Sequence, residues 1–119
     1  IILEKIRSIC QQMKEYGQVV PGFRRSPRAR DFYDIYAVSS KFMIDLTTAG
    51  NIEILRNIFK AKNVPLELIG KIKDSYEYHN TDYPSLESTV VNRSDLKPFK
   101  FYFDYVVDLC GSLKPARDE

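Results

Sequence analysis

The stretch "FKFYFDYVVDLCGSL", residues 99–113, decides the fold, because its composition would also suit a β-strand. Its aromatic and β-branched side chains favour strands. Its length and the spacing of its apolar residues favour a helix instead, since these residues recur at intervals of three and four. The residues that share this face are Phe99, Tyr102, Phe103, Val106, Cys110 and Leu113. We therefore predict a helix over residues 99–113.

The same periodicity predicts four earlier helices, over residues 1–16, 27–42, 51–64 and about 65–78. Gly17 is expected to end the first, and Ser26 followed by Pro27 to start the second, with the serine hydroxyl as its N-cap. Gly50 and Asn51 predict a break before the third. No pair of alternating strands with a hairpin turn is found. The predicted fold is all-α, a small bundle of about five helices in a single domain over residues 1–119.

Composition sets limits on the function. The chain has 119 residues, of which 44% are hydrophobic and 29% charged, as in an average globular domain. Its 18 basic and 16 acidic residues leave a net charge of +2, too small to indicate nucleic-acid binding by itself. No segment has the about 18 consecutive apolar residues that a membrane helix needs, and no signal peptide is recognisable. We expect a soluble cytoplasmic protein without a membrane partner, in which Cys10 and Cys110 are buried thiols.

Two aspartates in "RARDFYDIY", residues 28–36, are the first candidates for an active site. Asp31 and Asp34 are three residues apart, so a helix places their carboxylates at neighbouring points of one face. Two such groups can hold a divalent cation or accept a proton from a hydroxyl. The alternative is an ordinary helix start, in which the acids favour the positive end of the helix dipole and Arg30 pairs with Asp34.

Four arginines lie within seven residues where the loop at residues 17–27 meets this helix, namely Arg24, Arg25, Arg28 and Arg30. Guanidinium groups match phosphate oxygens, so this segment is a candidate site for a nucleotide or an RNA backbone. A solvated basic loop is the alternative. His79 is solitary in a polar segment, and we expect it at the surface.

Several short motifs together resemble those of one enzyme family. "LEKI" at residues 3–6 is followed by "RARDFYDIY" at 28–36, and then by "DYPSLESTV" at 82–90 and "LKPFKFYFDYVVDL" at 96–109. In this order and at these separations, they resemble the C-terminal half of the AbiEii/AbiGii toxin family of nucleotidyltransferases. In that family an E-K pair on one helix precedes an R-x-K/R-D-x-x-D signature, and both face the nucleotide site.

The resemblance implies that an N-terminal half is missing. The family's catalytic half carries a G-S motif and then a D-x-D motif on a mixed sheet, and residues 1–119 lack this arrangement. The chain would then be the C-terminal helical domain of a two-domain nucleotidyltransferase. Mg²⁺ and a nucleoside triphosphate would act in the complete protein, whereas the isolated domain would bind neither tightly and would be inactive.

The resemblance also implies roles for individual residues. Lys5 would contact the triphosphate and offset the charge of the leaving pyrophosphate. Asp31 would orient or deprotonate the acceptor hydroxyl, or support a metal ion whose main ligands lie on the other half. Asp34 would share that role or fix the helix start, and Arg28 and Arg30 would bind phosphate. On this hypothesis Lys5 and Asp31 lie within about 10 Å of each other and face one surface.

Two functions from different classes are therefore open. The first is nucleotide transfer of the toxin–antitoxin type to an acceptor such as tRNA or another RNA, with an antitoxin protein as a further partner. The second is a non-catalytic helical module that binds RNA or a protein through the arginine-rich loop and an exposed aromatic surface on residues 99–113. Salt-sensitive RNA binding that survives the loss of Lys5 and Asp31 would favour the second.

Overall fold

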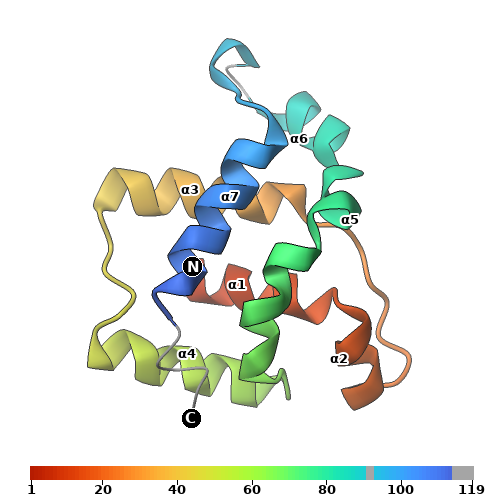
Figure 1. Ribbon diagram of the computed structural model, residues 1–119, viewed down its shortest axis with the longest axis vertical. Coiled ribbons are helices and arrows are strands. Elements are labelled where there is room, and N and C mark those ends of the chain that lie inside the picture. Colours follow the sequence, from red (N-terminus) through yellow and green to blue (C-terminus); the bar gives the residue numbers. More distant parts are fainter. Residues whose placement is uncertain (91–92, 114–119) are drawn as a thin grey trace.

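The computed structural model describes residues 1–90 and 93–113, and every regular element in these residues is helical (Figure 1). In chain order the elements are α1 (Ile2–Gln11), α2 (Lys14–Val19), α3 (Ala29–Phe42), α4 (Ala49–Ala61), the 3₁₀ helix η1 (Leu66–Asp74), α5 (Tyr76–Asn80), α6 (Tyr83–Thr89), the 3₁₀ helix η2 (Arg93–Asp95) and α7 (Phe99–Gly111). The all-α prediction is confirmed. The described residues contain more than the predicted five helices, because the predicted helices 1–16 and 65–78 are each divided in two, and α6 and η2 lie between the last two predicted helices.

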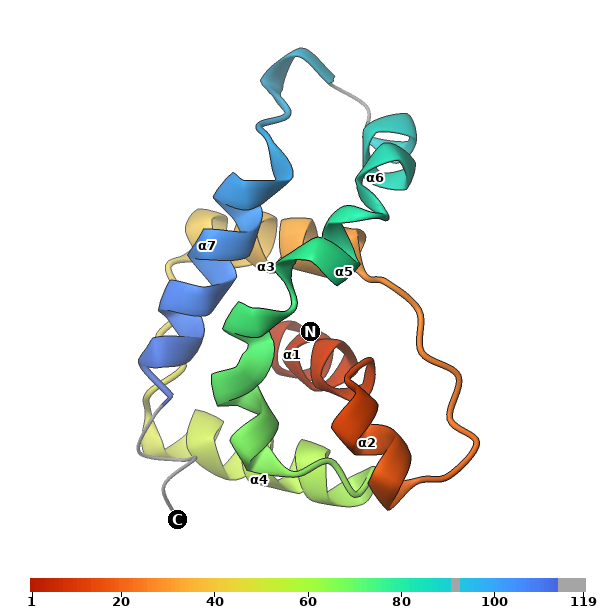
Figure 2. The same cartoon turned by 45° about the vertical axis from the view of Figure 1, so that its right-hand side comes forward.

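Helix α1 lies in the middle of the fold, with α3, α4 and η1 packed against it (Figures 1 and 2). Its buried side chains are Ile2, Leu3, Ile6, Ile9 and Cys10. Their three- and four-residue spacing is the one that predicted the helix. Because α1 packs against α3, the polar residues along its edge are held beside the start of α3.

Helix α7 forms where the fold-deciding stretch predicts it, and the predicted apolar face is buried from Phe99 to Leu113. The helix crosses α3 (Figure 1), and the ring of Phe32 lies 5.4 Å from that of Phe99 and 5.3 Å from that of Phe103, between centroids. Phe101, on the other side, is 39% exposed. The expected aromatic surface on this helix is therefore smaller than predicted, because Phe99, Tyr102 and Phe103 belong to the core while Phe101 and part of Tyr105 are exposed.

The first predicted helix, residues 1–16, is divided into α1 and α2, so its predicted length is wrong. The break lies at Gln12, which is buried and holds the following loop. Its backbone oxygen accepts a hydrogen bond from Arg25 Nε at 2.7 Å, and its side-chain oxygen accepts one from the Ser26 N–H at 2.8 Å. A continuous helix would need that backbone oxygen for residue 16. Gly17, expected to end the helix, lies inside α2.

Three further boundaries differ from the prediction. Gly50 and Asn51 lie in the first turn of α4, where the Thr48 hydroxyl oxygen accepts a hydrogen bond from the Asn51 N–H at 3.2 Å. Residues 65–78 form η1 and the start of α5 rather than one helix. Between the fourth and fifth predicted helices lies α6, with Pro84 at its beginning. Proline is tolerated there because the first N–H groups of a helix have no intrahelical partner.

The start of α3 is the boundary that matters most for the site. The predicted cap at Ser26 is wrong, because α3 begins at Ala29 and no side chain caps it from position 28. Two residues from far along the chain take its free N–H groups instead. Asp82 Oδ2 accepts a hydrogen bond from the Ala29 N–H at 3.1 Å, and His79 Nδ1 accepts one from the Arg28 N–H at 2.9 Å. Residues 79–82 therefore fix where α3 begins.

Replacing Asp82 by alanine is expected to lower the free energy of unfolding by about 1 kcal/mol, the typical effect of losing a helix N-cap. The Ala29 N–H would lose its acceptor. The matched control is Ser26→Ala, which should change the free energy of unfolding by less than about 0.5 kcal/mol. Urea unfolding followed by circular dichroism measures both. If Ser26→Ala lowered the free energy of unfolding more than Asp82→Ala, Ser26 would be the N-cap of α3, as the sequence predicts.

Both cysteines are free thiols and are buried, as predicted. Burial, and then the charge of nearby Cys110, raise the pKa of Cys10 well above its ordinary value, so its thiol stays protonated.

In the part of the chain that the structure describes, no helix combines the length and apolar character that crossing a bilayer requires.

Candidate functional site

The packing of α1 against α3 places Lys5 between two carboxylates. Lys5 Nζ lies 3.3 Å from Asp31 Oδ1 and 3.1 Å from Asp34 Oδ2. The predicted proximity of Lys5 and Asp31 is therefore confirmed, and Asp34 joins the same cluster. Asp31 and Asp34 are three residues apart on α3, so both point toward the same neighbouring helix.

The cluster is only partly open to solvent. The side chains of Lys5, Asp31 and Asp34 are 28%, 11% and 24% exposed. Burial by itself lowers the pKa of Lys5, but the hydrogen bond to Asp34 and the charges of both aspartates outweigh this effect and raise the pKa above its ordinary value of 10.5. Lys5 therefore carries its positive charge at neutral pH. It can attract an anion but cannot act as a proton acceptor.

Arg30 and Asp34 form the pair that the sequence predicted as a feature of the helix start. Arg30 Nε donates to Asp34 Oδ1 at 2.9 Å, and Arg30 Nη1 donates to the Thr89 hydroxyl at 3.1 Å. The second bond ties α3 to the end of α6. Asp34 is thus shared between Lys5 and Arg30, and Arg30 would have to leave these partners to reach a phosphate.

Arg28 lies on the open side of the cluster. It lines a surface pocket of about 340 Å³ together with Ile1, Glu4, Lys5, Arg7, Ser8 and Asp31. Within residues 1–90 and 93–113, the Arg28 guanidinium has no hydrogen bond or ion pair. Of the two arginines proposed for phosphate binding, Arg28 is therefore the one whose side chain is available.

Two polar atoms in residues that line this pocket have no hydrogen-bond partner, namely Arg7 Nε and Asp31 Oδ2. Buried polar atoms are normally paired, because an unpaired one loses its hydration without compensation. The sequence did not single out Arg7 or Ser8. Their signal lies in the helical spacing, since Glu4, Arg7 and Ser8 are three and four residues apart and share one face of α1.

The carboxylates of this cluster do not fit a magnesium site on their own. Among the residues that the structure describes, no group of three or more His, Cys, Asp or Glu side chains is arranged to hold a metal ion. Asp31 and Asp34 both face the Lys5 ammonium, which takes the place of a cation between them.

The arginine-rich segment does not act as one patch. Arg28 faces the Lys5 pocket and Arg30 pairs with Asp34, whereas the guanidinium of Arg25 lies 4.2 Å from the ring centroid of Tyr78. His79, which we expected at the surface, is 1% exposed, so this prediction is wrong. His79 accepts a hydrogen bond from the Arg28 N–H, which lies 51 residues earlier in the chain. No local sequence pattern indicates such a contact.

Comparison with known protein families, with curated proteins and with solved structures finds no match to this chain.

Proposed function

We propose that this chain is the helical C-terminal half of a nucleotidyltransferase of the toxin–antitoxin type, which binds a nucleoside triphosphate and the acceptor of the nucleotide. The observation that carries this proposal is the joint position of Lys5, Asp31 and Asp34, with Arg28 on the same pocket. These are the residues to which the family resemblance gives roles. They come from segments more than twenty positions apart, and an ordinary helix start does not require Lys5.

In the proposed reaction, Lys5 and Arg28 bind the phosphate oxygens. Lys5 is a permanent cation whose position is fixed by two carboxylates, and Arg28 offers a guanidinium fork. Arg7 lines the same pocket and adds a third positive charge, although its Nε atom is buried. Lys5, Arg7 and Arg28 outnumber the two acidic side chains of the same pocket, Glu4 and Asp31, and this positive excess would offset part of the charge that develops on the leaving pyrophosphate.

Asp31 and Asp34 have different surroundings, which supports different roles. Asp31 Oδ2 is buried and has no hydrogen-bond partner. In the proposed reaction the side chain turns this oxygen toward the pocket, where it accepts the hydrogen bond and then the proton of the acceptor hydroxyl. The hydroxyl oxygen attacks the α-phosphorus, and the bond to pyrophosphate breaks. Asp34 forms ion pairs with Lys5 and Arg30, so we propose that its role is to position Lys5. Mg²⁺ would be held by the N-terminal half, and we assign no step to it here.

The proposal places the other partners outside this chain. The N-terminal half would complete the nucleotide cleft, and the acceptor would be a tRNA or another RNA. An antitoxin protein would be a further partner.

Nucleotide binding tests the proposal at the level of this chain. We expect inorganic triphosphate to shift the NMR signals of backbone amides around Lys5 and Arg28, with an affinity in the millimolar range for a single wall of a cleft. Arg28→Met should abolish these shifts, because the variant removes an exposed charge and leaves the Lys5 ion pairs in place. Lys41→Met, an exposed charge at the last turn of α3, is the matched control and should bind as the wild type does.

Activity provides the second test, in the complete protein that carries the N-terminal half. Lys5→Met is expected to lower nucleotide transfer to RNA by about 10²- to 10³-fold, in line with the loss of one preorganised charge. Circular dichroism must show the same helix content, because the substitution leaves two carboxylates facing each other. Transfer at the wild-type rate in a folded Lys5→Met variant, or triphosphate shifts located away from α1 and α3, would contradict the proposal.

The alternative function, a non-catalytic module for RNA or a protein, loses one of its two supports. Its aromatic surface on residues 99–113 is largely buried, with Tyr102 and Phe103 in the core. Binding of RNA or a protein by the arginine-rich loop remains a proposal.

A further inference from the structure

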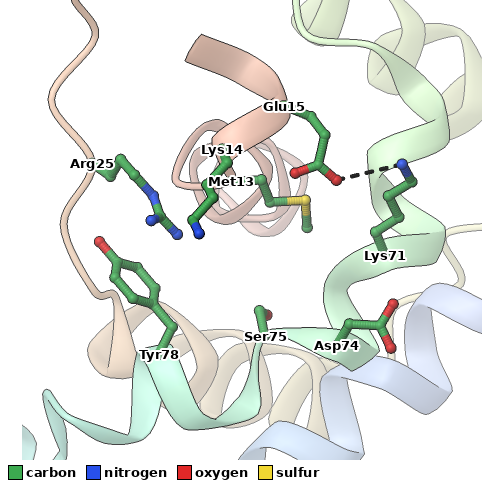
Figure 3. Close-up of a pocket in the computed structure, with 8 residues that line it drawn as sticks. All are labelled: Met13, Lys14, Glu15, Arg25, Lys71, Asp74, Ser75 and Tyr78. Carbon is green, nitrogen blue, oxygen red and sulfur yellow. Dashed lines mark ion pairs between the residues drawn. The ribbon is translucent and has the colours of Figure 1, made fainter. Parts of the chain in front are cut away.

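A second pocket lies between α2 and α5, away from the Lys5 cluster (Figure 3). It has a volume of about 200 Å³ and is lined by Met13, Lys14, Glu15, Arg25, Lys71, Asp74, Ser75 and Tyr78. These residues come from three separate segments of the chain: the start of α2, the loop before α3, and the region from η1 to α5. None of them takes part in the proposed nucleotide transfer.

The charges in this pocket are separated into two ends. Lys71 pairs with Glu15 at 3.4 Å, and Asp74 lies on the same side of the view in Figure 3. Lys14 and Arg25 lie on the other side, and both side chains point into the pocket (Figure 3). Among the described residues, neither Lys14 nor Arg25 forms an ion pair. Two positive groups that converge without an acidic partner repel each other, and an anion between them would relieve this repulsion.

Arg25 is held in place for such a role. Its Nε donates to the backbone oxygen of Gln12 at 2.7 Å, and its guanidinium lies 4.2 Å from the ring centroid of Tyr78. These two contacts fix the plane of the guanidinium, so the donors on its two terminal nitrogens stay free for a ligand. Little side-chain freedom would be lost on binding, which favours affinity.

We propose that the end of this pocket formed by Lys14, Arg25 and Tyr78 binds a phosphate group. Phosphate fits because a guanidinium presents paired donors to two of its oxygens and an ammonium adds a point charge. The ring of Tyr78 lines the same end of the pocket and lies against the Arg25 guanidinium (Figure 3). The phosphate belongs either to a free nucleotide or to the backbone of an RNA strand. This site does not depend on the proposed function, since it shares no residue with the Lys5 pocket.

Binding of three probes tests the site by NMR on the ¹⁵N-labelled chain at about 50 mM salt. The probes are inorganic phosphate, ATP without a metal ion, and single-stranded oligouridine RNA of about ten nucleotides. We expect the amides near Lys14, Arg25 and Tyr78 to shift. Lys14→Met should weaken the affinity about tenfold, the usual effect of one charge-assisted contact. Lys41→Met, an exposed lysine at the far end of α3, should not change it.

The probes also separate the two sources of phosphate. RNA that binds more tightly than ATP, with a salt dependence that decreases by about one charge in Lys14→Met, identifies a backbone phosphate. ATP that binds at least as tightly as the RNA identifies a free nucleotide. The proposal is overturned if none of the probes shifts these amides, or if Lys14→Met and Lys41→Met bind alike. Shifts confined to Lys5 and Arg28 would support the proposed function and reject this site.

Discussion

Replacing Phe32 by alanine is expected to lower the free energy of unfolding by about 3–5 kcal/mol, as for other fully buried phenylalanines. Phe32 is 0% exposed, and its ring lies 5.4 Å from that of Phe99, 5.3 Å from that of Phe103 and 5.0 Å from that of His79, between centroids. The substitution would leave a cavity where α3, α5 and α7 meet. Domains of this size are stable by only about 5–15 kcal/mol, so the variant should unfold at a much lower urea concentration.

A phenylalanine at the other end of the same helix provides the control. Phe42 is 64% exposed, so Phe42→Ala should change the free energy of unfolding by less than about 0.5 kcal/mol. Both variants and the wild type are compared by urea unfolding, followed by circular dichroism, with a common slope against urea. If Phe42→Ala cost as much as Phe32→Ala, the core would not be where α3 and α7 cross.

The fold class was predictable because the apolar side chains of the longer helices repeat with the helical period. Residues 99–113 show this best, since their aromatic content suggested a strand while their spacing gave the observed α7. Burial of one helix face produces that spacing whatever the side chains are, so the period is a more reliable guide than composition.

Helix boundaries were predicted less well, because distant residues determine them. The start of α3 depends on His79 and Asp82, which lie more than 50 positions further along the chain. The break after α1 depends on the bonds of Gln12 to Arg25 and Ser26. Local signals such as Ser26 before Pro27 describe what a short peptide favours. They do not include an acceptor that the fold brings from elsewhere.

The candidate site was predictable only in part, for a related reason. The spacing of Asp31 and Asp34 left a helix start and an active site open. The structure contains the ion pair of the first interpretation, between Arg30 and Asp34, and also the Lys5 contacts expected from the second. The two interpretations are therefore compatible, because one carboxylate has two oxygens and can accept from two cations. Arg7 escaped prediction because its position in the pocket depends on how α1 meets the residues around Arg28.

Acidification from pH 6.5 to about pH 4 is expected to lower the free energy of unfolding by up to about 3 kcal/mol through His79 alone. Burial, and then the charges of Arg25 and Arg28, lower the pKa of His79 from 6.5 to about 4. Within this window the unfolded chain binds a proton that the folded chain does not bind. The stabilising contribution is therefore complete above pH 6.5, decreases as the pH falls, and is lost near pH 4.

The hydrogen bond at the start of α3 gives this effect a structural cause. His79 Nδ1 accepts the Arg28 N–H at 2.9 Å, and protonation would place a hydrogen on that nitrogen, so it could no longer accept. His79→Asn tests this, because the asparagine oxygen can accept the same N–H but does not titrate. The difference in unfolding free energy between wild type and variant, measured in urea at steps from pH 7 to pH 4, cancels the carboxylates that titrate in the same range. We expect the wild type to lose about 3 kcal/mol more than the variant. Parallel pH profiles would mean that His79 titrates alike in both states, which is incompatible with its acceptor role for α3.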